Sequence, residues 1–236
     1  MPEKRVVVSV TSDVACPWCW VGKRAIEAAA ARLNASNPDS PFELELHWKP
    51  FQLMPDIAPG TTMNFFDHLV KVYGNPRIVE QWTQHPETIP MNRSCAASKL
   101  PNIEFRYTAQ NVSFSTYRAH TLLTYTGPIQ KNWAAQNRLK EAMLRMTHKE
   151  GKNLDSLEAL LAASKEAGVA KTQQEVETIL NDAKVKALLD EELRAYRRLP
   201  QFDGVPYFAF PNGKNFSGGQ PLEVFEAALT EVLNEQ

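Results

Sequence analysis

The spacing of hydrophobic and polar positions along the chain predicts its secondary structure. Val6 to Val10 form a nearly unbroken β-branched run, which is typical of a central strand covered on both faces. Residues 17–34 follow a helical spacing, and "FELELHW" (residues 42–48) alternates strictly, as a second strand does. A strand, a helix and a strand within about forty-five residues predict a right-handed βαβ unit.

After Pro50 the pattern changes, because a proline-rich stretch leads into a long block with helical spacing and no convincing strand. A further helical stretch at 184–198, the apolar run "GVPYFAF" and a closing amphipathic helix at 221–234 complete the chain. We therefore expect one α/β layer structure built from residues 1–50 and 184–236, interrupted by an inserted helical domain, or lid, of residues 51–183. The helical spacings within the insertion lie near residues 64–73, 92–100, 116–125, 130–149 and 154–167.

Length and charge exclude several classes of protein. A chain of 236 residues with 43% hydrophobic residues can bury an ample core without disulfides. A formal net charge of -1 gives no electrostatic case for nucleic acid or an anionic membrane, and no stretch approaches a transmembrane span. The apolar run after Arg5 is too short for a signal-peptide core, so we expect a cytoplasmic protein.

Two of the three cysteines, Cys16 and Cys19, flank a Pro-Trp dipeptide between the first strand and the first helix. A structural zinc site needs four ligands, but Cys95 and the five histidines stand singly, so we expect no metal. A structural disulfide across two residues would constrain the unfolded chain little, and a reducing compartment would work against it. Two unrelated buried thiols are the plain alternative. The position between strand and helix favours a working dithiol.

The helix start suggests different roles for the two thiols. Pro17 suits the first helical position, which places Cys16 at the N-cap with its sulfur exposed and facing free backbone N–H groups. The positive end of the helix favours a thiolate, so we expect the pKa of Cys16 to lie below the free-cysteine value of about 8.5. Cys19, nearly one turn later and more buried, can bond to it. We expect Cys16 to attack and Cys19 to resolve.

A second candidate feature is the proline in "DGVPYFAF". Pro206 stands just before an apolar strand, where a proline needs either a special turn or an edge position. A cis Val205–Pro206 bond would offer the Val205 backbone to an extended substrate chain, whereas a trans proline would only start an edge strand; the residues alone leave both open. Trp18, between the cysteines, is a candidate flat contact for substrate.

Other candidates compete with simpler structural roles. His120 could line the lid-side wall of a substrate groove, although a lone helical histidine more often packs or hydrogen-bonds. Gly218 could allow close approach of a ligand, although turn geometry also accounts for it. We expect Trp20 to pack in the core, Lys23 to be solvated and Cys95 to be a small helix residue.

Together these residues resemble the DsbA-like thioredoxin superfamily, specifically its FrnE-like branch of cytosolic dithiol oxidoreductases. The resemblance implies an α/β thioredoxin fold with an all-helical insertion after the second strand, and a cis Val205–Pro206 bond. The matching stretches, which span nearly the whole chain, are "SDVACPWCWVGKR", "HWKPFQLMPD", "STYRAH", "GVPYFAF" and "SGGQPLEVFEAAL".

Two positions depart from the pattern of this superfamily. Val10 stands where many thioredoxin-like proteins carry a buried carboxylate, and Asp13 is a nearby polar substitute whose simpler role is in a turn or cap. The Pro-Trp dipeptide lacks the imidazole of strongly oxidising relatives. We therefore expect a milder oxidant.

The expected function is that of a thiol–disulfide oxidoreductase or isomerase acting through a mixed disulfide on protein or peptide substrates. The redox-active cysteine pair would be its only cofactor, with glutathione as a candidate reductant. One alternative is a glutathione-dependent isomerase or kappa-class-like glutathione transferase, although such proteins typically hold serine at the position of Cys16. The other is a non-catalytic, metal-holding protein. The sequence leaves open the direction of electron flow and whether the chain is a monomer or a homodimer.

Overall fold

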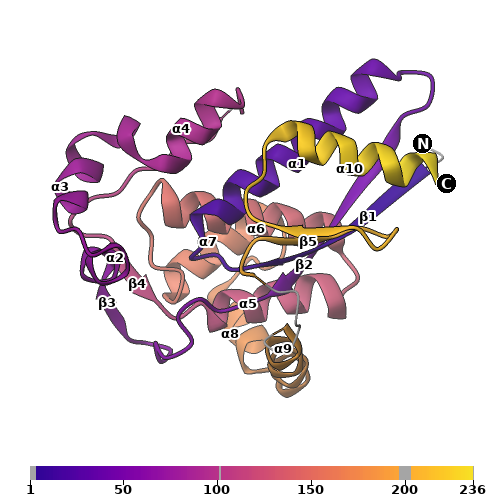
Figure 1. Cartoon of the computed structure of the whole chain (residues 1–236). Helices are drawn as coiled ribbons and strands as arrows, with labels where there is room; N and C mark the ends of the chain where they lie inside the picture. Colours follow the sequence, from indigo (N-terminus) through magenta and orange to yellow (C-terminus); the bar gives the residue numbers. More distant parts are fainter. Residues whose placement is uncertain (1–3, 101, 197–202, 236) are drawn as a thin grey trace.

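The computed structural model describes residues 4–100, 102–196 and 203–235, and a four-stranded sheet in the order β2-β1-β5-β6 lies at its centre (Figure 1). Strands β1 (Lys4–Ser12) and β2 (Phe42–Pro50) are parallel, with Val8 opposite Leu46. The helix α1 (Pro17–Ser36) connects them, which confirms the predicted βαβ unit. Strand β1 extends two residues beyond the predicted run at each end and β2 two residues beyond its predicted last residue, because their backbone pairing continues past the apolar pattern.

The other two strands are short and come from the end of the chain. Strand β5 (Tyr207–Ala209) pairs antiparallel with β1, and β6 (Asn215–Ser217) pairs antiparallel with β5. The last helix, α10 (Leu222–Asn234), packs beside α1, and both lie above the sheet in the view of Figure 1. The apolar stripe of α10 is buried there, with Phe225 and Leu229 fully buried.

The insertion between β2 and β5 is mainly helical, but it is not free of strands. Strands β3 (Thr62–Asn64) and β4 (Val112–Phe114) pair antiparallel, so the expectation of an insertion without strands is wrong. Three residues are too few to show an alternating pattern in the sequence.

Two helices of the insertion, α3 (Arg77–Gln84) and α8 (Gln173–Asn181), were also not predicted. The helices are α2 (Phe65–Tyr73), α3 (Arg77–Gln84), α4 (Pro90–Ala97), α5 (Tyr117–Thr124), α6 (Trp133–His148), α7 (Leu157–Ala167), α8 (Gln173–Asn181) and α9 (Ala183–Tyr196), with a 3-10 turn at Pro86–Thr88 and a π-helical turn at Tyr125–Ile129.

Two hydrophobic cores hold these elements together. The first joins the sheet, α1 and α10 to aromatic residues of the insertion, including Trp82 and Phe105. The second lies among α5 to α8 and includes Val14, two residues before Cys16. The turn that carries the first cysteine therefore packs into the core of the insertion, whose boundaries with the α/β layer remain a prediction. Across the described ranges, no helix is both long and apolar enough to cross a membrane.

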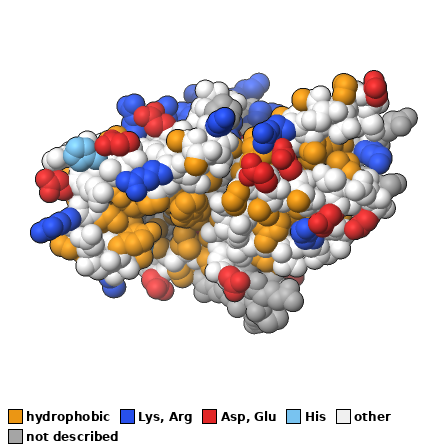
Figure 2. Space-filling model, turned by 45° about the horizontal axis from the view of Figure 1, so that its top comes forward, with side chains coloured by type: hydrophobic (Ala, Val, Ile, Leu, Met, Phe, Trp, Pro, Cys, Tyr) orange, Lys and Arg blue, Asp and Glu red, His pale blue; other side chains and the backbone are white. Residues whose placement is uncertain are grey.

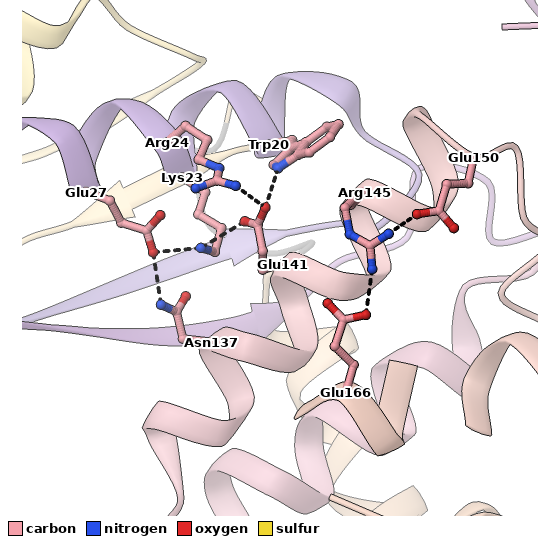
Figure 3. A network of polar contacts seen from close by, with 9 residues as sticks. All are labelled: Trp20, Lys23, Arg24, Glu27, Asn137, Glu141, Arg145, Glu150 and Glu166. Carbon is pink, nitrogen blue, oxygen red and sulfur yellow. Dashed lines mark hydrogen bonds and ion pairs between the residues drawn. The ribbon is translucent and has the colours of Figure 1, made fainter. Parts of the chain in front are cut away.

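A partly buried polar network connects α1 to α6 (Figure 3). The Glu141 carboxylate of α6 accepts hydrogen bonds from Trp20 Nε1 at 3.0 Å and Arg24 at 2.6 Å, and it lies 3.0 Å from Lys23 Nζ. Lys23 also pairs with Glu27 at 2.6 Å. The expectation that Lys23 is solvated is wrong, since only 3% of its side chain is exposed. Two carboxylates from different helices compensate its burial.

Candidate active site

The turn between β1 and α1 presents the first cysteine at the start of the helix. Cys16 is the N-cap with an extended backbone, and Pro17 follows as the first helical residue, as predicted. The Cys16 backbone N–H donates to the Asp13 carbonyl at 3.2 Å, which closes the turn. The Sγ atom of Cys16 lies 3.4 Å from the Val205 carbonyl oxygen, which belongs to a distant part of the chain.

Both cysteines of the pair are free thiols, and both are buried. Cys19 is fully buried, as expected for the second thiol, but Cys16 is only 4% exposed, so the expectation of an exposed first sulfur is wrong. The loop that carries Val205 comes from a distant part of the chain and covers the sulfur. Cys16 nevertheless lines a cleft, which gives a substrate a route to it.

The pKa values of the two thiols move in opposite directions. The pKa of Cys16 lies well above its usual value because its thiol hydrogen-bonds to Cys19 and because burial disfavours its thiolate. Burial also opposes the Cys19 thiolate, but the hydrogen bond from Cys16 and the charge of Lys140 bring the pKa of Cys19 below its usual value. The expected lowering of the Cys16 pKa is therefore not found. The Cys19 backbone N–H at the helix start does favour the Cys16 thiolate, but the hydrogen bond to the Cys19 side chain and burial outweigh it.

The loop before β5 holds the Val205 backbone next to Cys16. The Val205–Pro206 bond is cis. Pro206 itself is buried, and its carbonyl accepts a hydrogen bond from the Gly218 N–H at 2.7 Å. Gly218 has a φ of 91°, a conformation that favours glycine. Val205 lines the cleft, whereas Pro206 and Gly218 are not among its lining residues, contrary to expectation.

The cleft has a volume of about 450 Å³ and runs from Cys16 into the insertion. Figure 2 shows hydrophobic side chains gathered around a hollow on the face that contains α1 to α4. Trp18 is half-buried at this cleft, as expected of a residue that could contact substrate. The walls are mostly apolar and come from both parts of the chain: Ala15, Cys16, Pro17, Trp18, Leu53, Met54, Phe65, His68, Leu69, Val72, Tyr73, Trp82, Tyr107, Asn111, Val112, Ser113, Phe114, Thr147, His148 and Val205.

His120 does not line this cleft, contrary to expectation. Its ring is buried, and Nε2 lies 3.2 Å from Oδ1 of the buried Asp13. Asp13 also accepts a hydrogen bond from the Leu53 N–H at 2.8 Å. Burial alone would raise the pKa of Asp13, but the hydrogen bond and charge of His120 and the Leu53 N–H lower it overall. Asp13 thus ties the turn before Cys16 to α5 and to the segment after β2.

Nearly the whole chain matches one known protein family. A model described as the DSBA-like thioredoxin domain matches residues 7–230. The chain belongs to the DsbA-like thioredoxin family. Among curated proteins, no significant match was found.

Solved structures agree with membership of the DsbA-like family. A probable DsbA oxidoreductase from Streptomyces coelicolor is 26% identical, with a TM-score of 0.75 over 98% of this chain and 91% of that chain. The cytosolic disulfide reductase DsbM from Pseudomonas aeruginosa is 17% identical, with a TM-score of 0.58 over 98% and 100%; a second structure of it, with GSH, gives 0.53 at the same identity over 97% and 99%. A 2-hydroxychromene-2-carboxylate isomerase is 16% identical, with a TM-score of 0.60 over 97% of both chains. The thioredoxin fold with a helical insertion is therefore established.

The sequence pattern did not identify two residues near this site, Lys140 and His148. Lys140 of α6 is fully buried, and its Nζ has no hydrogen-bond partner within the described part of the chain. This Nζ lies 5.4 Å from the Trp48 ring centroid. His148, at the end of α6, is buried on the cleft with Nδ1 3.3 Å from the Tyr107 hydroxyl. The helical spacing of α6 could have marked position 140, because it lies three and four residues before the apolar Met143 and Leu144 on the buried face of that helix.

The described residues contain no group of three or more His, Cys, Asp or Glu side chains that could hold a metal ion. Cys16 lines the cleft with a free thiol, and the free thiol of Cys19 follows three residues later in α1.

Proposed function

We propose that this protein is a thiol–disulfide oxidoreductase that exchanges disulfides through Cys16 and Cys19. One observation carries the proposal: two free thiols lie about one helical turn apart, and the first lines a cleft beside the Val205 backbone. Two thiols that only filled space in the core would need neither a cleft beside them nor a hydrogen bond between them. The membership of the DsbA-like family, whose relatives include oxidoreductases, supports the same chemistry.

Cys16 is the attacking thiol in this proposal because it lines the cleft and Cys19 does not. As Cys16 attacks one sulfur of a substrate disulfide, its proton passes to the Cys19 thiolate, and the other substrate sulfur leaves as a thiolate. Cys19 then loses a proton to the leaving sulfur or to solvent and attacks Cys16. A Cys16–Cys19 disulfide forms, and the substrate, now a dithiol, has gained two electrons. The reverse sequence oxidises a dithiol.

The surroundings of the pair suit this exchange. Burial lowers the pKa of Lys140, and in its protonated form this lysine favours the thiolate that forms on Cys19. The Val205 carbonyl, held by the loop around Pro206, would align an extended substrate chain, and Trp18 would contact its side chains. The proposal includes both isomerase and oxidoreductase activity, on protein or peptide substrates, without a cofactor besides the dithiol.

A cytoplasmic site of action and reduction by glutathione also belong to the proposal. The structural neighbour DsbM is described as a cytosolic disulfide reductase, and one of its structures contains GSH. At 17% identity this likeness shows the fold alone. The formal net charge of -1 leaves nucleic acid and anionic membranes as unexpected partners, and we propose a monomer or a homodimer.

A glutathione-dependent isomerase is the alternative that the structural neighbours suggest, because one of them is a 2-hydroxychromene-2-carboxylate isomerase. The cleft beside Cys16 is large enough for a small organic substrate. The presence of a second thiol at Cys19 favours disulfide exchange, since an isomerisation would not need a resolving thiol.

Redox titration of the Cys16/Cys19 couple against glutathione buffers tests the proposal, with insulin reduction and refolding of a scrambled protein assayed on the same sample. Cys19→Ser should accumulate a mixed disulfide with substrate, and Cys16→Ser should lose exchange altogether. Cys95→Ser is the matched control, because Cys95 is buried in α4 and burial raises its pKa to about 11. Full activity of Cys16→Ser on a small electrophile would instead favour the isomerase, and failure of the couple to exchange with glutathione buffers would refute the proposal.

A further inference from the structure

Tyr107 of the insertion lines the same cleft as Cys16, and the exchange described above gives it no role. We propose that the Tyr107 hydroxyl donates a hydrogen bond to the substrate sulfur that leaves when Cys16 attacks a disulfide, and that His148 positions this hydroxyl. The inference rests on the proposed function, because it assigns a further residue to the first step of that exchange.

The first step of the exchange creates a negative charge inside the cleft. The Cys16 sulfur bonds to the nearer substrate sulfur, the substrate S–S bond breaks, and its electron pair leaves on the farther sulfur. Since the proton of Cys16 passes to the Cys19 thiolate, the charge moves from Cys19 to the leaving sulfur. None of the described residues that line the cleft is Lys or Arg, and the pKa values of its two histidines, His68 and His148, are lowered by burial. The new thiolate therefore needs an uncharged hydrogen-bond donor.

Tyr107 is held so that its hydroxyl can be this donor. Its ring stacks on Phe65 at 4.8 Å between centroids and on Trp82 at 5.8 Å, and only 4% of the residue is exposed. The hydroxyl oxygen lies 3.3 Å from Nδ1 of His148, which is long for a hydrogen bond from a hydroxyl group. The neighbouring rings thus fix the hydroxyl in place, while its proton can turn from His148 to a stronger acceptor at little cost.

The hydroxyl also lies within reach of charge at the reacting sulfur. Burial raises the pKa of Tyr107, and the charge of Cys16 raises it further. Two S–S bonds in line span about 4 Å, so the leaving sulfur lies that far beyond Cys16, and its donor must line the cleft without touching Cys16 itself. Because the pKa of Tyr107 stays above that of a thiol, Tyr107 keeps its proton, and the leaving thiolate takes a proton from solvent.

His148 is suited to hold the hydroxyl between turnovers. Its imidazole is buried at the end of α6 and lines the cleft. It is neutral at pH 7, so with its proton on Nε2 it accepts the hydroxyl proton at Nδ1. Nε2 makes no hydrogen bond within the described part of the chain, although the Val14 and Cys16 carbonyls act on the pKa of the ring. The ring therefore lies beside the turn that carries Cys16.

Tyr107→Phe tests the hydroxyl alone, since it keeps the stacked ring. The reduced protein is mixed with either of two uncharged disulfides at pH 7, and chemical quenching with mass spectrometry gives the rate at which its cysteines oxidise. Bis-hydroxyethyl disulfide releases a basic alkyl thiolate, whereas dipyridyl disulfide releases an aromatic thiolate of low basicity that leaves readily without a donor. Tyr107→Phe should lower the second-order rate constant about 10- to 100-fold for the alkyl disulfide and by no more than about twofold for the aromatic one.

Two further variants separate the donor from a structural role. Tyr117→Phe is the matched control, because the Tyr117 hydroxyl donates to Asp190 at 2.9 Å and Tyr117 does not line the cleft. It should leave both rate constants unchanged. His148→Ala should slow the alkyl disulfide more than the aromatic one, by less than Tyr107→Phe does; equal losses with both disulfides would overturn the positioning role of His148.

The outcomes separate this inference from the proposed function. Equal losses with both disulfides in Tyr107→Phe would overturn the inference, and so would unchanged rates with both or the same selective loss in Tyr117→Phe. Each of these results leaves disulfide exchange through Cys16 and Cys19 intact. Failure of the wild-type protein to reduce either disulfide, together with no mixed disulfide in Cys19→Ser, would overturn the proposed function and this inference with it.

Discussion

The Glu141 carboxylate links the helix that carries the cysteine pair to the insertion, and Glu141→Gln should weaken that link measurably. The substitution keeps the shape of the side chain and removes its charge. Its three partners, Trp20, Lys23 and Arg24, all belong to α1 and lie between 2.6 and 3.0 Å away (Figure 3). The neutral amide can still accept one hydrogen bond but no longer compensates two cations.

The size of the effect follows from the burial of these partners. Lys23 is only 3% exposed but keeps its pairing with Glu27, and the Arg24 side chain is 28% exposed. Breaking a buried ion pair costs about 3–5 kcal/mol, and a hydrogen bond to a charged group contributes about 1.5–3 kcal/mol. We expect a loss of about 2–3 kcal/mol in the free energy of unfolding, since Lys23 is not left alone. For a chain of this length, this corresponds to a fall in Tm of about 4–12 °C.

Urea unfolding followed by circular dichroism at pH 7 measures this loss, and thermal unfolding gives the Tm. The matched control is Glu166→Gln, because Glu166 pairs with Arg145 at 2.6 Å and its side chain is 49% exposed. An exposed pair of this kind contributes about 0–1 kcal/mol. If Glu141→Gln destabilises the protein no more than Glu166→Gln does, the proposed link between α1 and α6 is wrong.

The Glu141 effect should also depend on pH. Burial would raise the pKa of Glu141, but Lys23 and Arg24 lower it overall. A carboxyl group whose pKa is lower in the folded state stabilises the protein above the pKa of the unfolded chain, and this stabilisation is lost as the pH falls through the folded pKa. The difference between wild type and Glu141→Gln should therefore shrink in acid, and a constant difference down to the acid transition would contradict the electrostatic explanation.

Three further substitutions test other parts of the structure. Lys140→Met should raise the pKa of Cys19, since it removes the charge that favours the thiolate. Ultraviolet thiolate absorbance across pH measures this shift. Lys140→Arg should retain the wild-type titration curve. Burial lowers the pKa of His148 from 6.5 to about 3. The stabilisation that the neutral ring gives the folded state is therefore complete above about pH 6.5 and falls by about 1.4 kcal/mol per pH unit toward pH 3. His148→Gln should remove that slope from the free energy of urea unfolding, and an unchanged slope would refute this account. Gly22→Ala should destabilise the protein by about 1–3 kcal/mol, because a Cβ there would lie 2.9 Å from Phe208 Cζ; unchanged stability would show that this ring moves aside freely.

The sequence by itself determined the features that depend on local spacing. The β-branched run, the alternation of residues 42–48 and the helical stripe at 221–234 predicted β1, β2 and α10, because each periodicity reflects one buried face of one element. The position of Pro17 placed Cys16 at the N-cap for the same reason, since the preferences of a helix start act over a few residues.

The tertiary structure alone decided what surrounds the thiols. Asp13 and His120 are 107 positions apart, and only the packing of α5 against the turn before Cys16 brings them together. Whether a lysine is solvated or buried depends equally on distant segments: Lys23 meets Glu141 from another helix, and Lys140 is enclosed with no hydrogen-bond partner among the described residues. The electrostatics of a buried site depend on desolvation and on charges from remote segments, and the periodicity of a single element records neither.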